Sequence, residues 1–221
     1  MSTQPAEIVR EYGPFEDPAG GPAPVAGITH DGRHVWAALG QALVAFDPDS
    51  GAVTQRLARP CDAGTAFDGR HLYQIAGTRI DRIDPATGEV LASIPAPGQG
   101  GDSGLAWAEG SLWVGQHRGR VIHQVDPATG AVLRSIQSNR FVTGVTWVDG
   151  ELWHGTWEDE TSDIRRIDPA DGRVLACLQM PPGAGVSGLE SDGADLFYAG
   201  GGRSGKVRAV RRPATRPHTP D

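Results

Sequence analysis

Apolar and polar residues alternate through short segments of this chain, and small polar turns separate those segments. Residues 141–182 give the clearest example, with GVTW, ELWHGTW, DIRRIDP and VLACLQM divided by VDG, EDETS and ADG. Alternation with a period of two is typical of half-buried β-strands, and Asp-Gly pairs favour tight hairpins. The pattern predicts a meander of four short strands, which needs similar neighbours to bury its faces.

Two signatures recur in fixed phase along the sequence. A glycine opens the first strand of each unit, at positions 27, 64, 104, 144 and 188, with spacings of 37, 40, 40 and 44 residues. A DPxxG turn precedes the last strand of four units, at 47–51, 84–88, 126–130 and 168–172. A four-stranded repeat of about 40 residues is typical of a propeller blade.

The sequence therefore predicts an all-β fold, a five-bladed β-propeller formed as one domain by residues 1–212. The expected blades span about 23–58, 59–97, 98–138, 139–182 and 183–212. The fifth unit lacks a fourth strand, and we expect residues 7–14 to supply it and close the ring, because closure protects exposed strand edges. An open β-solenoid and a β-sandwich are the alternatives, and residues 213–221 are expected to form a disordered tail.

Charge and composition indicate which partners and which cellular compartment to expect for this protein. The formal net charge is -7, so no nucleic-acid partner is expected, since no basic surplus is present to neutralise phosphates. Two cysteines cannot form a disulfide framework, and no apolar run approaches the ~18 residues of a membrane span. The first 20 residues lack an apolar signal segment, so the sequence predicts a soluble cytoplasmic protein with no membrane partner.

Candidate chemistry lies in the loops at one mouth of the predicted central channel, where a small propeller is expected to bind ligands. His117 and Glu158 are candidate general bases. Arg140 and Arg203 can stabilise developing negative charge, and Trp157 supplies an aromatic wall. Further candidate substrate contacts are Asp62, Asp102, Gln74 and His154.

Several of these residues also have a structural interpretation. His117 can be an edge residue, His154 a residue packed between blades, and residues 156–163 a solvated acidic loop rather than a lid over a ligand. Cys61, in an expected loop, is a candidate nucleophile that nothing in the sequence activates. His117 and His154 are not at HxxxH or HxH spacing, so no cofactor is predicted, and a divalent metal in the channel is the open alternative.

Three segments carry a family resemblance. They are LYQIAG (72–77), WVDGELWHGTW with IRRIDPADGRVL (147–175) and GLESDGADLFYAGG (188–201). These segments are similar to blades of plant- and bacterial-type glutaminyl-peptide cyclotransferases, and the repeats more distantly resemble streptogramin (virginiamycin B) lyases. The resemblance implies a five-bladed propeller and an enzyme that cyclises an N-terminal glutamine.

The resemblance is incomplete at the family's functional positions. An alanine of VWAALG (35–40) stands where the family has a glutamate, whereas Gln74 and Trp157 keep the family's residues. We therefore expect a partner that is a small molecule or a peptide N-terminus, and proton-transfer chemistry of a diverged cyclotransferase or lyase type. The alternative is a non-catalytic propeller that binds a ligand or a protein.

Overall fold

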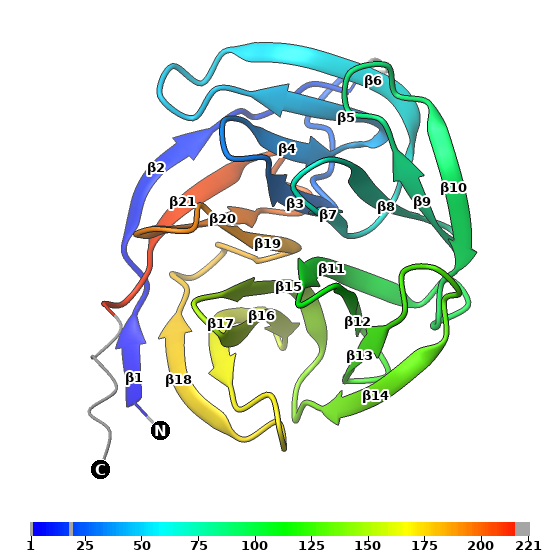
Figure 1. Ribbon diagram of the computed structural model, residues 1–221. Helices are drawn as coiled ribbons and strands as arrows, with labels where there is room; N and C mark the ends of the chain where they lie inside the picture. Colours follow the sequence, from blue (N-terminus) through cyan, green and yellow to red (C-terminus); the bar gives the residue numbers. More distant parts are fainter. Residues whose placement is uncertain (1, 18–19, 215–221) are drawn as a thin grey trace.

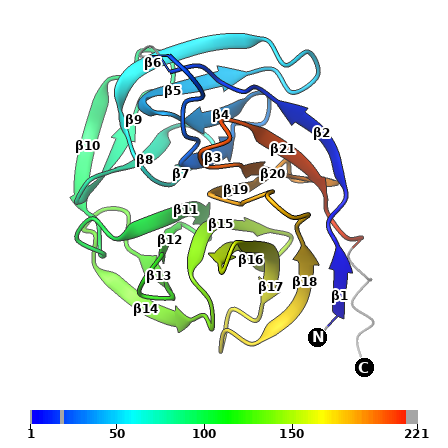
Figure 2. The same ribbon diagram turned by 180° about the vertical axis from the view of Figure 1, so that it is seen from behind.

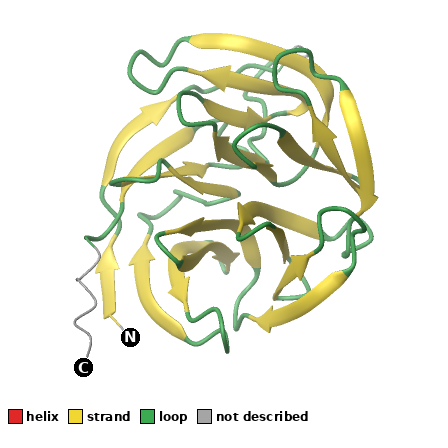
Figure 3. Cartoon of the chain, in the orientation of Figure 1, coloured by secondary structure: helices red, strands yellow, loops and turns green. Residues whose placement is uncertain are grey.

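The structure, a computed structural model, describes residues 2–17 and 20–214, which form five β-sheets arranged around an axis (Figure 1). These residues form 21 strands and no helix, so no helix among them is available to cross a membrane (Figure 3). The predicted all-β, five-bladed propeller is confirmed. Residues 215–221 of the expected tail lie outside the described part of the chain.

Each blade is an antiparallel meander that begins near the axis and ends at the outer rim (Figure 1, Figure 2). The first blade contains β3 (Gly27–His30), β4 (Val35–Ala38), β5 (Gly40–Phe46) and β6 (Val53–Cys61). The second contains β7 (Thr65–Phe67), β8 (Leu72–Ala76), β9 (Arg79–Ile83) and β10 (Val90–Pro95). The third contains β11 (Asp102–Ala108), β12 (Ser111–Gln116), β13 (Val121–Val125) and β14 (Val132–Gln137). The fourth contains β15 (Val142–Val148), β16 (Glu151–Glu158), β17 (Thr161–Ile167) and β18 (Val174–Gln179). The fifth contains β19 (Gly188–Ser191), β20 (Leu196–Gly200), β21 (Val207–Arg211) and β2 (Ile8–Tyr12).

The N-terminal strand closes the ring, as predicted for residues 7–14. β2 pairs antiparallel with β21 and becomes the outer strand of the fifth blade. Tyr12 at its end is buried, with its ring centroid 4.8 Å from that of Phe46 in the first blade. The Tyr12 hydroxyl donates a hydrogen bond to the Pro48 carbonyl at 2.9 Å. These contacts join the last blade to the first and remove the open edges of the array.

The sequence pattern does not predict one further strand. β1 (Ser2–Pro5) pairs in parallel with β18 and adds a fifth strand to the fourth blade (Figure 1). All four of its residues are exposed, and their sequence STQP shows no apolar alternation. A strand held by backbone pairing alone leaves no hydrophobic period in the sequence.

The five opening glycines meet around the axis, which explains their regular recurrence. A Cβ atom on Gly64 would lie 2.4 Å from the backbone nitrogen of Leu105, and one on Gly144 would lie 2.5 Å from that of Leu189. The other three opening glycines face the backbone of the next inner strand in the same way. Only glycine permits this approach, so the inner strands come into direct backbone contact at this level.

The DPxxG turns adopt the conformation that their sequence predicts. In the first turn, the Asp47 carboxylate accepts the N–H groups of Asp49 and Ser50 at 2.9 and 2.7 Å, and Gly51 has a φ of 78°. The other three turns repeat the contact from aspartate to N–H and the positive φ of glycine. This end of the propeller is therefore built from four similar local motifs.

The outer strand of the first blade runs a few residues past the expected blade boundary at about residue 58. β6 extends to Cys61, which is fully buried in the strand rather than placed in a loop. Burial raises the pKa of the Cys61 thiol to about 11, so this group is protonated at neutral pH and is a poor nucleophile.

Candidate functional site

A cavity of about 610 Å³ lies at the end of the propeller opposite the DPxxG turns. Its lining comes from the third, fourth and fifth blades and from the connection that precedes β19, and includes His117, Trp157 and Arg203. No described residue of the first two blades lines it. The cavity is therefore at the predicted mouth but to one side of the axis.

His117 follows β12 and forms the third-blade side of the cavity. Its ring packs against Phe141, with 4.7 Å between ring centroids, and its backbone N–H donates to the Gly101 carbonyl at 3.3 Å. Partial burial, together with the nearby charge of Arg118, lowers the pKa of His117 below its ordinary value of 6.5. The imidazole is consequently neutral at pH 7 and can accept a proton.

Trp157 forms an apolar wall on the fourth-blade side. The side chain is 37% exposed, which leaves part of the indole open to a ligand. Another part of the ring lies over Gly185, where an added Cβ would come within 2.9 Å of it. The absence of a side chain at Gly185 therefore lets the connection before β19 pack directly on the indole.

The glycine-rich segment after β20 forms the fifth-blade side and has an ordered set of hydrogen bonds. The Gly202 N–H donates to Ser187 Oγ at 2.9 Å, and that hydroxyl donates in turn to the Val25 carbonyl. Ser204 Oγ donates to the Gly201 carbonyl at 2.8 Å. Arg203, between these residues, is exposed and forms no ion pair or hydrogen bond within the described part of the chain.

The acidic segment at 156–163 is a hairpin, which corrects the expectation of a long loop. β16 runs to Glu158 and β17 begins at Thr161, so the turn consists of Asp159 and Glu160, which have φ values of 52° and 59°. Two consecutive residues with positive φ are typical of a type I′ hairpin turn.

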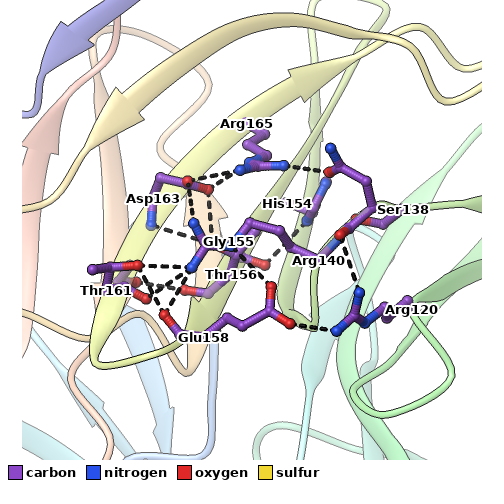
Figure 4. Close-up of polar contacts among 12 residues, drawn as sticks. Arg120, Ser138, Arg140, His154, Gly155, Thr156, Glu158, Thr161, Asp163 and Arg165 are labelled. Atoms are coloured by element: carbon purple, nitrogen blue, oxygen red, sulfur yellow. Dashed lines mark hydrogen bonds and ion pairs between the residues drawn. The ribbon is translucent and has the colours of Figure 1, made fainter.

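Glu158 and Asp163 belong to a network of ion pairs beside the cavity (Figure 4). Arg120 donates to the Glu158 carboxylate, and Arg140 Nε lies 3.4 Å from the other Glu158 oxygen. Arg140 also lies 3.4 Å from Asp163, and Arg165 donates to Asp163 at 2.7 Å. Although burial opposes ionisation of Asp163, the hydrogen bonds from Arg165 and Thr156 lower its pKa. The network ties the third blade to the fourth.

The ion pairs of this network limit the chemistry that Glu158 and Arg140, two of the predicted site residues, can perform. Both carboxylate oxygens of Glu158 face arginines, so accepting a substrate proton would break an ion pair. Arg140 donates to the Glu158 carbonyl and to Thr161 Oγ1, both at 2.8 Å, and is therefore occupied by protein groups. Of the predicted acid–base and charge-stabilising residues, His117 and Arg203 are those that line the cavity.

The other predicted substrate contacts lie outside the cavity lining. Gln74 is fully buried and donates to the carbonyls of Ala63 and Ile75 at 3.1 and 2.7 Å. Asp62 accepts the Gly77 N–H at 3.1 Å, which holds its own blade together.

Asp102 and His154 are also buried away from the lining. Asp102 accepts the Gly98 N–H at 2.9 Å, and burial raises its pKa. His154 is completely buried, with Nδ1 3.1 Å from the Gly155 carbonyl, and burial lowers its pKa to about 4. The structural interpretation of His154 as a packed residue agrees with this position.

One chemically unusual residue was not singled out by the sequence. Glu190 lies in β19, and its carboxylate accepts hydrogen bonds from Thr29 Oγ1 at 3.0 Å, from Thr146 Oγ1 and from the Ser191 N–H at 2.9 Å. Burial raises the pKa of Glu190 to about 7. The sequence could have indicated this residue by its position in the repeat. Glu190 lies two residues after an opening glycine, and Thr29 and Thr146 lie at the same position in their own blades.

Glu190 thus joins the inner strands of the first, fourth and fifth blades.

Within residues 2–17 and 20–214, no group of three or more His, Cys, Asp or Glu side chains is arranged to hold a metal ion.

Comparison with known proteins gives matches among solved structures, whereas no family model and no curated protein matches the chain. A glutaminyl cyclase from Myxococcus xanthus matches with TM-score 0.76 and 19% identity, over 95% of this chain and 97% of that one. The WD40 β-propeller domain of Doa1 gives 0.54 and 16%, over 85% and 64% of the two chains. A hydrazine synthase from Kuenenia stuttgartiensis gives 0.51 and 19%, over 93% and 60%. At these identities the likeness is one of fold, and the chain is similar to a glutaminyl cyclase along nearly its whole length.

Proposed function

We propose that this propeller acts on a small molecule or a peptide in the cavity between His117, Trp157 and Arg203, by proton-transfer chemistry of a cyclotransferase or lyase type. The observation that carries the proposal is a neutral imidazole on the same cavity as an open indole and a guanidinium that has no ion-pair partner among the described residues. The fold-level likeness to a glutaminyl cyclase supports the reaction class.

Each residue has a defined task in this proposal. His117 accepts a proton from the attacking or eliminated position of the substrate and returns it to the leaving group. For an N-terminal glutamine, the α-amine attacks the side-chain amide carbon, the C–N bond to the amide nitrogen breaks, and ammonia leaves with the transferred proton. Arg203 stabilises the oxyanion that forms on the amide oxygen, and Trp157 shields the reacting atoms from water.

The second candidate is a ligand-binding propeller without turnover. It is favoured by the alanine in VWAALG, where the similar family has a glutamate, and by the engagement of Glu158 with two arginines. The same cavity and the same wall would then serve recognition alone.

An assay for ammonia release from peptides with N-terminal glutamine tests the enzymatic proposal. Ammonia release that is lost in His117→Asn supports the cyclase reaction at this cavity. If the chain binds ligands that shift the Trp157 indole resonance but transforms none of them, the binding alternative replaces the enzyme. Ammonia release that is unchanged by His117→Asn would show that the base lies elsewhere.

A further inference from the structure

The side chains that line the cavity have a net positive charge, although the chain as a whole has a net negative charge. Eleven residues line the cavity, and their only titratable side chains are those of His117 and Arg203, with no carboxylate among them. The chain as a whole has a formal net charge of -7. A cationic ligand would therefore find no counter-charge in this lining, whereas an anion would find the Arg203 guanidinium, which is unpaired within residues 2–17 and 20–214.

The ion-pair network on the fourth-blade side adds to this balance. Arg120, Arg140 and Arg165 face only Glu158 and Asp163, so three cations are paired with two anions. Glu158 and Asp163, on the two strands of this hairpin, are thus paired with arginines, whereas the exposed Asp159 in the turn forms no ion pair among the described residues. Glu160, in the turn, lines a separate groove that also contains Pro5 and Met180.

A second network on the fifth-blade side has the same sign. Lys206 and Arg208 both contact Glu11, at 2.7 and 2.9 Å, so two cations share one anion. Arg208 is buried, and its Nη1 lies 3.4 Å from the carbonyl of Gly185, a lining residue. Each of the two ion-pair networks beside the cavity therefore contains one more cation than anion, which favours an anion over a cation near these walls.

The shape of the cavity and its backbone groups complement an anion with a flat body. The exposed part of the Trp157 indole offers a stacking surface, and four lining glycines leave room in front of it. The N–H groups of Gly185 and Arg203 form no hydrogen bond within the described part of the chain and are available to an acceptor. Apolar stacking and several donors on one cavity are the usual composition of a small-molecule site.

We propose that this cavity recognises a small organic anion carrying a flat group, with Arg203 binding the anion and Trp157 stacking on the flat group. The inference rests on the proposed site and narrows its substrate class, since a positively charged amine is disfavoured there. In a glutaminyl substrate, the recognised anion would be a nearby carboxylate and not the reacting amine, which must be neutral to attack.

Four ligands of similar shape test this inference with the full chain. They are 3-phenylpropionate, 3-phenylpropionamide, phenethylamine and phenyl phosphate, titrated by calorimetry and by NMR of the tryptophan indoles. We expect either anion to bind at least about tenfold more tightly than the amide, and the amine to bind most weakly. A preference of phenyl phosphate over 3-phenylpropionate, or the reverse, identifies the anionic group.

Arg203→Gln is the decisive variant, and Arg70→Gln is its matched control, because Arg70 is exposed in a turn at the other end of the propeller. We expect Arg203→Gln to abolish the preference for anions and Arg70→Gln to preserve it. Binding of the amide or the amine as tightly as the anions would overturn the inference, as would a preference unchanged in Arg203→Gln or no saturable binding of any ligand.

The same measurements separate this inference from the proposed function. Anion binding that needs Arg203, without turnover of any substrate, supports the inference and contradicts catalysis. Turnover that needs His117 but is indifferent to substrate charge supports catalysis and contradicts the inference.

Discussion

The end of the propeller with the DPxxG turns and the end with the cavity differ in the range of the contacts that hold them. In the turns, an aspartate accepts N–H groups two or three residues away, as Asp47 and Asp126 both do. At the cavity, Arg120 reaches Glu158 across 38 residues, and Ser187 reaches Val25 across 162. The end with the DPxxG turns repeats one local turn motif four times. The end with the cavity brings together residues that differ in type and are far apart in the sequence.

The largest expected effect separates the histidines of the two ends. His117→Asn should lower turnover about 10²–10⁴-fold, because a general base contributes that much to a proton-transfer step. His71, paired with Asp68 at 3.2 Å in a turn of the other end, is the control, and His71→Asn should leave turnover unchanged. Initial rates of ammonia release under saturating substrate measure both variants.

The pH profile provides a second readout of His117. The base must be neutral, and burial lowers the pKa of His117 below 6.5, so activity should fall on acidification with a midpoint below pH 6.5. An acidic limb that persists in His117→Asn would contradict the assignment of the base.

Glu190, between the two ends, should produce the next largest effect, on stability rather than activity. The pKa of Glu190 is about 7 in the folded chain against an ordinary 4.5, so the folded state holds the proton more tightly. The stabilisation is complete below pH 4.5 and is lost as the pH rises through 7. Over this range the loss amounts to at most about 3 kcal/mol.

Glu190→Gln tests this because glutamine is neutral at every pH and similar in shape. Denaturant titrations at pH 4 and pH 8 should show equal stability at pH 4 and a more stable variant at pH 8. A difference between the two proteins that does not change with pH would show that Glu190 does not titrate in this range.

Glu158→Gln should have a smaller effect that is confined to the cavity end. The change leaves Arg120 and Arg140 without their shared carboxylate and should cost about 1–2 kcal/mol of stability. Because Arg120 also lies over the Phe141 ring that packs on His117, we expect KM to rise more than kcat falls. Glu160→Gln, in the exposed turn of the same hairpin, is the control and should change neither quantity. Equal effects of the two substitutions would show that the network does not position the cavity walls.

The difference between short-range contacts at one end and long-range contacts at the other explains which features the sequence could predict. The opening glycines and DPxxG turns repeat, so they revealed the number of blades, their order and the closure by β2. The repeat assigns the segments that hold His117, Trp157 and Arg203 to one end of the propeller, and all three residues line the cavity at that end. Their joint position on an off-axis cavity depends on side-chain packing between blades, which no local pattern encodes.

Two of the remaining candidates show the limit of reasoning from residue type. His154 and Gln74 carry chemically useful groups, but both are fully buried, and their hydrogen-bond partners are groups of their own blades: the Gly155 carbonyl for His154, and two carbonyls and the Thr65 hydroxyl for Gln74. Glu190 was overlooked because a single acidic residue in a strand resembles a solvent-facing one. Its hydrogen bonds to Thr29 and Thr146 join strands that are 161 and 44 residues away.

The smallest expected effect concerns one DPxxG turn. Asp126→Ala removes the acceptor for the N–H groups of Ala128 and Thr129 and should lower stability slightly, without changing turnover. Asp84→Ala removes the equivalent acceptor for Ala86 and Thr87 and should cost nearly the same amount. Thermal and denaturant unfolding of the two single variants and the double variant measure these losses, which should add because the turns share no partner. Unequal losses, or a change in turnover, would mean that this end is not a set of independent local motifs and that the two ends are coupled.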